Sequence, residues 1–176
     1  ASAYLTGLIA GRMTETNKVG FIGGMESPVI SKFDYGFRAG VKAANPDAEV
    51  MVQYANSFTD SALGKTIANQ MYSNGADIVF TCGGDVGTGA IEAAKENGKK
   101  AIGVDQDQNS LAPENVITSA MKNIDVSVEE MLSKVVDGSY KGGEIIVNTL
   151  AMNGVGIPQS SEKNVPPDVL TYVKEE

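Results

Sequence analysis

The sequence of 176 residues contains no histidine, no tryptophan and a single cysteine, Cys82. Without histidine there is no histidine-based catalytic triad, histidine-ligated metal or histidine proton shuttle. One cysteine excludes an intrachain disulfide and every cysteine-rich zinc module. Basic residues are also scarce, since 14 Lys and Arg stand against 22 Asp and Glu, a formal net charge of −8. This balance argues against a nucleic-acid-binding protein, which needs surplus basic side chains for phosphate contacts.

Long hydrophobic runs are absent as well. No stretch approaches the roughly 20 apolar residues of a membrane-spanning helix, and the opening residues lack the basic region of a signal peptide. The composition, 42% hydrophobic and 20% charged, is that of an ordinary globular protein. The first residues instead repeat apolar side chains at helical spacing and predict an amphipathic helix: Tyr4, Leu5, Leu8, Ile9 and Met13.

Short apolar runs alternate with helical patterns over the first two thirds of the chain. Strands are expected at residues 19–22, 50–52, 78–80 and 101–104. Each strand–helix unit takes about 30 residues, the size of a βαβ crossover. Four such units in series predict an α/β fold, in which helices cover both faces of a parallel sheet.

The pattern changes after Pro113. Residues 116–121 predict a further extended segment, Asp125 is placed to cap a helix that ends at Gly138, and residues 145–147 predict another strand. A polar tail with three prolines follows. The helix and strand after Asp125 have no sequential partner in the first sheet, so we expect them to belong to a second lobe together with the opening helix. The expected division is residues 1–16 in an absent first lobe, 17–124 as a ligand-binding α/β lobe, and 125–176 as a return segment and tail.

Residues directly after parallel strands lie along the crevice where open α/β sheets bind ligands. Four segments occupy such positions: residues 23–27, 56–60, 82–88 and 105–108. They supply aromatic rings, glycines and carboxylates, but no nucleophile paired with a base. This inventory predicts binding of a polar, ring-bearing small molecule without catalysis and without a cofactor.

A glycine turn at residues 83–89 follows the third strand and opens a helix, as a phosphate-binding loop would. Its glycines are spaced GxxGxG, which differs from the dinucleotide fingerprint, and no Walker lysine follows. Asp85 would also repel a phosphate. We interpret the turn as a place where the backbone of Gly84 approaches a neutral ligand.

Two carboxylates after the fourth strand allow two interpretations. Asp105 and Asp107 together are able to present oxygen ligands to Mg²⁺. Alternatively, Asp105 alone accepts hydrogen bonds from ligand hydroxyls while Asp107 faces solvent. The second interpretation is favoured, and no metal site is expected, because no other acidic residue clusters nearby in the sequence.

The remaining candidates are two rings, a lysine and the cysteine. Phe58 lies in a polar loop, where a ligand-stacking role is favoured. Phe33 has the helical spacing of a core residue, and stacking on a ligand is its alternative. Lys122 either faces solvent or points into the crevice, with neither favoured. Cys82, at a buried strand end, is expected to be a small core residue.

The order of these motifs resembles the basic membrane protein family of substrate-binding lipoproteins, which includes the purine nucleoside receptors of ABC transporters. The resemblance extends to about Gly156, and seven segments carry it: residues 18–24, 28–37, 57–60, 75–79, 83–89, 102–108 and 118–122. It implies a type I periplasmic-binding-protein fold, in which two lobes hold a ligand between them without changing it. Carried over by position, the ligand-binding residues would be Phe33, Phe58, Gly84, Asp105 and Lys122.

The resemblance also implies partners and a location. These are a nucleoside ligand, an ABC permease, and a place outside the cytoplasmic membrane, either periplasmic or lipid-anchored in the full-length protein. Asp85 stands where the family usually has glycine, so an extra carboxylate is expected in the cleft. The leading lobe of the family is missing, so apolar side chains of the return segment and opening helix should lack their partner. We expect them to favour self-association or a complementary fragment, or else to pack in an arrangement that differs from the family. Those side chains are Leu5, Leu8, Ile9, Val128, Met131, Leu132, Val135 and Val136.

Three other functions fit parts of the sequence. A binding protein for a sugar or an autoinducer uses the same kind of site. The effector-binding domain of a transcription regulator shares the two-lobe fold, although no helix-turn-helix motif is present. A Mg²⁺-dependent enzyme built on the two carboxylates is the least favoured. The choice of ligand is open at this stage.

Overall fold

The predicted apolar runs form neighbouring strands of one sheet in a computed structural model, which describes residues 1–176. The strand order is β2-β1-β3-β4-β5-β6, with the first five parallel and β6 antiparallel to β5. The strands are β1 (Lys18–Gly23), β2 (Glu49–Tyr54), β3 (Ile78–Cys82), β4 (Lys100–Asp105), β5 (Val116–Lys122) and β6 (Val155–Gly156). The α/β fold expected from the sequence is confirmed.

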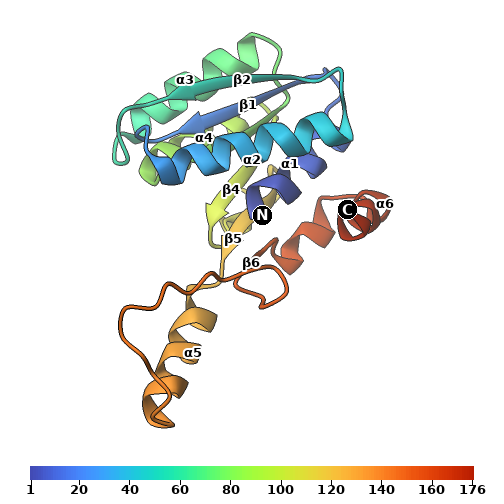
Figure 1. The fold of residues 1–176 in the computed structure, drawn as a ribbon. Helices are drawn as coiled ribbons and strands as arrows, with labels where there is room; N and C mark the ends of the chain where they lie inside the picture. The colour runs from blue at the N-terminus through green and yellow to red at the C-terminus, as the bar shows by residue number, and fades with distance from the viewer.

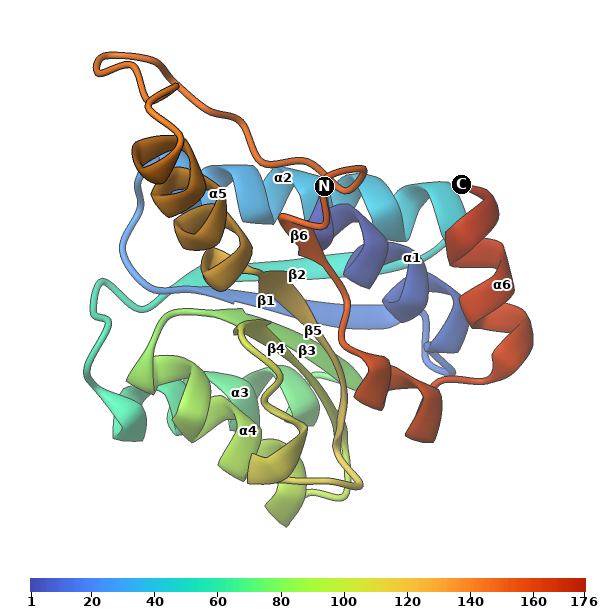
Figure 2. The same cartoon turned by 90° about the horizontal axis from the view of Figure 1, so that it is seen from below.

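Helices cover both faces of this sheet (Figures 1 and 2). The helices are α1 (Ser2–Met13), α2 (Pro28–Ala44), α3 (Ser61–Ser73), α4 (Asp85–Glu96), α5 (Ile124–Val136) and α6 (Pro167–Glu175), with short 3-10 turns at Asn109–Leu111 and Gln159–Lys163. Ser27 and Asp60 cap α2 and α3, since the side chain of each accepts a hydrogen bond from the backbone N–H three residues on. None of the helices is both long and apolar enough to cross a lipid bilayer.

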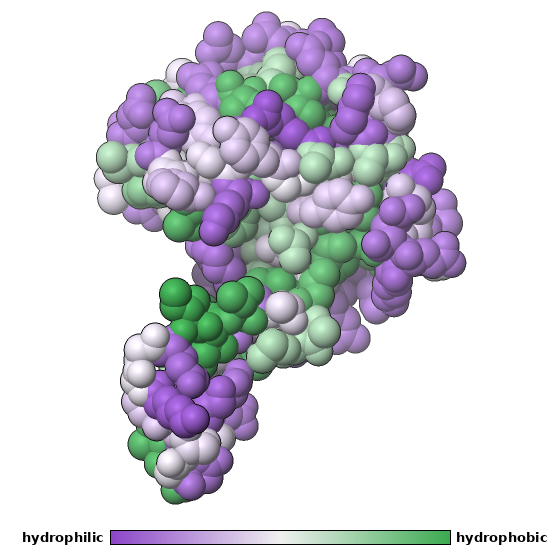
Figure 3. Space-filling model, in the orientation of Figure 1, coloured by the Kyte–Doolittle hydropathy of each residue, from purple (hydrophilic) through white to green (hydrophobic).

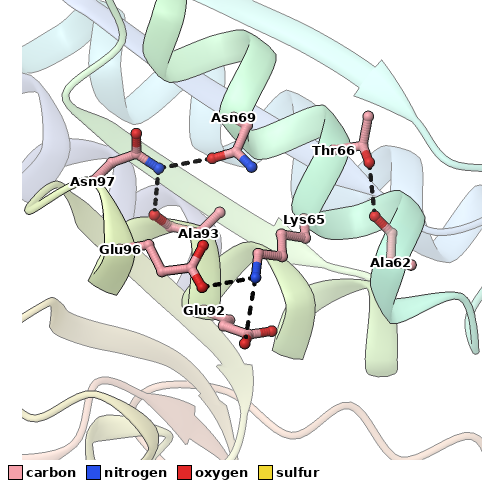
Figure 4. A network of polar contacts seen from close by, with 8 residues as sticks. All are labelled: Ala62, Lys65, Thr66, Asn69, Glu92, Ala93, Glu96 and Asn97. Atoms are coloured by element: carbon pink, nitrogen blue, oxygen red, sulfur yellow. Dashed lines mark hydrogen bonds and ion pairs between the residues drawn. The ribbon is translucent and has the colours of Figure 1, made fainter.

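The two faces of the sheet carry cores of different character. Under α1, α2 and α6 the core is aromatic, with the Phe80 ring centroid 5.5 Å from that of Phe21 and 5.1 Å from that of Phe37. Under α3 and α4 the core is rich in alanine. The small side chains let α3 and α4 pack closely, and Lys65 then reaches Glu92 and Glu96 across the two helices (Figure 4).

The opening helix packs on this sheet, and the expectation that its apolar face serves another lobe is wrong. Leu8 and Ile9 are fully buried in the aromatic core. Gly7 and Gly11 lie against the backbone of α2, where an added Cβ would collide. Glycines at this four-residue spacing let two helix backbones approach closely. The spacing is visible in the sequence, but the sequence does not tell which element α1 packs against.

The C-terminal third differs from expectation in two further places. Residues 145–147 are irregular, and Ile145 is 93% exposed, because no neighbouring strand is available to pair with them. The polar, proline-containing tail, for which the sequence predicts no helix or strand, forms α6, which buries Val169 and Val173. Pro167 occupies the first helical position, where proline starts a helix rather than breaking one.

Helix α5 and the segment after it project from the rest of the molecule (Figure 1). We call residues 124–154 the arm and the remaining residues, 1–123 and 155–176, the body. None of the residues of α5 is buried. The cap position is Asn123, two residues before the expected cap at Asp125, and no side chain caps the helix.

Candidate functional site

A hollow of about 600 Å³ lies at the carboxyl ends of β4 and β5, where the body meets the arm. The glycine turn at the start of α4 forms one wall, and the first residues of α5 form another. Three of the five ligand-binding residues expected from the sequence line it: Gly84, Asp105 and Lys122. This is the position at which open parallel sheets bind ligands.

Asp105 and Lys122 are joined by an ion pair, with 2.8 Å between Lys122 Nζ and Asp105 Oδ1. Each is the last residue of its strand, and the pairing of β4 with β5 places the two ends side by side. Asp105 has a φ of +68°, a left-handed conformation that non-glycine residues seldom adopt. The side chains are 57% and 37% exposed, so the pair adds little stability and its effect is to orient the carboxylate.

Phe33 lies beneath this ion pair. Its side chain is 9% exposed and belongs to the aromatic core, with its ring centroid 6.4 Å from that of Phe80. Lys122 Nζ lies 4.8 Å from the Phe33 ring centroid, a cation–π contact. The structure therefore places Phe33 in the core and Lys122 in the crevice, between an aromatic ring and a carboxylate.

Phe58 stands beside the glycine turn, in the loop between β2 and α3, and is 40% exposed. Its ring rests on Gly24, where an added Cβ would collide with ring carbons. Its backbone oxygen accepts a hydrogen bond of 2.8 Å from the N–H of Asp85. Gly84 has a φ of +59° and lies against the same carbonyl, so this position needs glycine. These contacts hold an exposed ring at the edge of the sheet.

Side chains of the segment after β4 accept hydrogen bonds from nearby backbone N–H groups. Asp107 Oδ1 accepts a hydrogen bond from the N–H of Asn109 at 3.0 Å, and Gln108 Oε1 accepts one from the N–H of Val104 at 2.9 Å. Asp107 does not line the hollow, whereas Asp105 does. The two carboxylates thus face different surroundings, and no group of three or more acidic or cysteine side chains gathers here to hold a metal.

Cys82 lies at the end of β3 and is 4% exposed. Burial raises the pKa of its thiol from 9.0 to about 12, and the charge of Asp105 acts in the same direction. The thiol stays protonated near neutral pH and is a poor nucleophile there. The expectation of a small core residue is confirmed.

Several residues at the rim were missed by the sequence reasoning. Asn123 and Asp125 line the hollow and are not among the predicted site residues. Thr88 and Asp85 line it as well, and both belong to the segment 82–88 that the sequence places along the crevice. Asp125 has the sequence position of a helix cap, and Asn123 carries no distinctive pattern. The placement of Asn123 and Asp125 depends on how α5 leaves β5, which no local motif encodes.

The arm presents an exposed apolar face. Val128, Leu132 and Val136 are 51%, 58% and 87% exposed. Figure 3 shows apolar surface near the start of α5. For these side chains the expected lack of a partner within the chain is confirmed.

A family model described as "ABC transporter substrate-binding protein PnrA-like" matches residues 1–175. The chain is 41% identical over 189 residues to the CD4+ T-cell-stimulating antigen of Listeria monocytogenes, covering 98% of this chain and 53% of the relative. It is 43% identical over 173 residues to the ABC transporter nucleoside-binding protein BmpA of Lactococcus lactis, covering 89% and 49%.

Solved structures give the same picture. An ABC transporter solute-binding protein from Aeropyrum pernix superposes with a TM-score of 0.82 at 27% identity, over 99% of this chain and 56% of that protein. A transcriptional activator of the comK gene from Bacillus halodurans superposes with a TM-score of 0.89 at 24% identity, which shows the fold alone. The chain spans about half the length of the curated relatives it matches. It belongs to the PnrA-like family of ABC transporter substrate-binding proteins.

Proposed function

We propose that this chain forms one wall of a cleft that holds a purine nucleoside for ABC-type import. The ligand is bound between the body and a second lobe, delivered to a membrane permease, and released unchanged. The protein acts outside the cytoplasmic membrane, in the periplasm or attached to the membrane by a lipid. The observation that carries the proposal is the hollow, where Asp105, held by Lys122, lies at the sheet edge together with Gly84.

Each residue has a role that follows from its chemistry. The exposed ring of Phe58 stacks on the base, which every purine allows because it has a flat π-face. The backbone of Gly84 approaches the ligand, at a position that needs glycine because an added Cβ would meet the Phe58 carbonyl. Asp105 accepts hydrogen bonds from ribose hydroxyls, and Lys122 both orients that carboxylate and offers donors of its own. Phe33 supports Lys122 from the core.

Two observations support a second lobe: the uncovered arm, and the length of the chain relative to its curated relatives. Residues 124–154 leave the body with an apolar face uncovered, and the chain spans about half of its curated relatives. We therefore propose that the arm packs on a second lobe, so that the hollow becomes one half of an enclosed site. The body, with α1 included, is the ligand-binding lobe.

We propose a nucleoside rather than another ligand because of the name of a relative that is similar in sequence. The Lactococcus lactis relative, at 43% identity, is named a nucleoside-binding protein. A periplasmic ribose transport protein and a LacI-family regulator have similar folds but are only 15% and 18% identical to this chain. These two similarities support the fold and do not point to a ligand. A sugar, an autoinducer or a regulatory effector is therefore an outcome of the test rather than a second proposal.

Isothermal titration calorimetry of the full-length protein tests the proposal, with adenosine, guanosine, inosine and ribose as ligands. We expect tight binding of at least one purine nucleoside and none of ribose. The isolated 176-residue chain should bind the same nucleoside far more weakly, because one wall of the cleft is absent. At a nucleoside concentration of 100 times Kd, the full-length protein should be stabilised by about 2.7 kcal/mol. Binding of ribose alone, or equal affinity in the isolated chain, would contradict the proposal.

A further inference from the structure

The hollow contains more negative than positive charge. Asp85, Asp105 and Asp125 line it, and Lys122 is its one basic side chain. The ammonium of Lys122 is already engaged, 2.8 Å from the carboxylate of Asp105. Asp85 and Asp125 therefore remain without a cation on the hollow surface.

Asp85 occupies a position with a distinct electrostatic effect. It is the first residue of α4, at the helix end that carries a partial positive charge. A glycine turn leading into a helix is the arrangement that binds phosphate in many proteins, because backbone N–H groups and the helix dipole point at the anion. Here a carboxylate sits at that end, and the N–H of Asp85 itself donates to the carbonyl of Phe58. The positive end of the helix dipole is thus offset by a carboxylate, and one of the N–H groups at this end is already occupied.

From this placement we propose that Asp85 is a specificity residue that excludes phosphorylated forms of the ligand. The inference rests on the proposed nucleoside function and adds a selection rule to it. A neutral nucleoside experiences no net repulsion from Asp85, whereas its monophosphate brings a doubly charged group toward two unpaired carboxylates. Because Asp85 is exposed, salt partly screens this repulsion.

The test compares Asp85→Asn with a matched control in the full-length protein. Asp85→Asn keeps the shape of the side chain and removes its charge. Glu92→Gln removes one negative charge from the same helix, on the side that faces Lys65 and away from the hollow lining (Figure 4). Calorimetry measures adenosine, guanosine and inosine together with their 3′- and 5′-monophosphates, at low and high salt.

We expect the wild type to bind a nucleoside at least about 100-fold more tightly than either monophosphate, a difference of about 2.8 kcal/mol at a factor of ten per 1.4 kcal/mol. Asp85→Asn should reduce the ratio of nucleoside affinity to monophosphate affinity by about tenfold. Glu92→Gln should behave as the wild type, and high salt should reduce the discrimination.

Each contrary result has its own meaning. Equal binding of nucleoside and monophosphate by the wild type overturns the inference and leaves the nucleoside function standing. Unchanged discrimination in Asp85→Asn, or the same gain in Glu92→Gln, also overturns it, because the effect would then not be local to Asp85. A wild type that binds neither compound contradicts the proposed function itself.

Discussion

Helices α2 and α5 are both amphipathic, yet their apolar faces have opposite environments. α2 buries Ile30, Phe33, Phe37 and Val41 against the sheet, whereas α5 buries none of its residues. The apolar pattern of a helix therefore indicates that a partner is needed, and it does not indicate where that partner is. In the body the partner is the sheet of this chain. For the arm, we propose a second lobe.

The largest expected effect is on the free energy of unfolding, which should respond to substitutions in the body and hardly to those in the arm. Phe37→Ala removes a fully buried ring from the aromatic core and should lower the free energy of unfolding by about 3–5 kcal/mol. Leu132→Ala, in the arm, should change it by less than about 0.5 kcal/mol, because the side chain is 58% exposed. Urea unfolding of the isolated chain, followed by circular dichroism, measures both. A large loss in Leu132→Ala would mean that the arm packs on the body in solution.

The exposed face of the arm should also affect association. We expect the isolated chain to self-associate, and a variant with Val128→Lys and Leu132→Lys to sediment as a monomer. Val29→Lys, on an exposed position of α2, is the control because it adds charge to the body instead. Analytical ultracentrifugation distinguishes these results. A wild-type chain that stays monomeric at high concentration would contradict the expectation.

The site lies where the two regions meet, and its residues should affect binding without affecting the fold. Phe58→Ala and Asp105→Ala should each weaken nucleoside binding by the full-length protein by about 1–3 kcal/mol. Phe58 is 40% exposed and the Asp105 side chain 57%, so neither truncation opens a cavity in the core.

Two substitutions at exposed positions, one on α2 and one in the turn after it, serve as controls for this prediction. Tyr35→Ala removes an exposed ring from α2, and Asp47→Ala removes an exposed carboxylate. Calorimetry should give wild-type affinity for both. Wild-type affinity in Phe58→Ala and Asp105→Ala as well would remove those residues from the site.

The smallest change to the molecule uses thiols as probes of the two regions. Cys82 in the body should react slowly with a thiol reagent at pH 8, because its pKa is raised to about 12 by burial. A Val136→Cys variant in a Cys82→Ala background places the thiol at a position that is 87% exposed. The thiolate fraction of Cys82 should be lower by roughly a thousandfold, at tenfold per pKa unit, and labelling kinetics should follow it.

The raised pKa of Cys82 also makes the stability of the folded chain depend on pH. The thiol of Cys82 ionises at lower pH in the unfolded chain than in the folded one, since its folded pKa is raised from 9.0 to about 12. Its contribution to stability is therefore complete below pH 9 and is lost as the pH rises toward 12. Over that interval, the free energy of unfolding of the wild type should fall relative to that of Cys82→Ala. Fast labelling of folded Cys82 at pH 8 would contradict both expectations.

Much of the body could be predicted from the sequence because its information is local. Apolar runs of strand length, helical periodicity between them and caps such as Ser27 and Asp60 are all read within a few residues. The strand ends are predictable for a related reason. Once the sheet is parallel, its carboxyl ends meet at one edge, and Gly84 and Asp105 must lie near one another there.

The sequence by itself thus determined the α/β class, the order of its elements and the edge at which ligand-binding residues gather. Only the tertiary structure decided which surfaces pair. It placed α1 on α2, folded the proline-rich tail into α6, and brought Lys122 between Phe33 and Asp105. These contacts join residues that are distant in the chain and depend on strand pairing and helix packing, so no local periodicity encodes them.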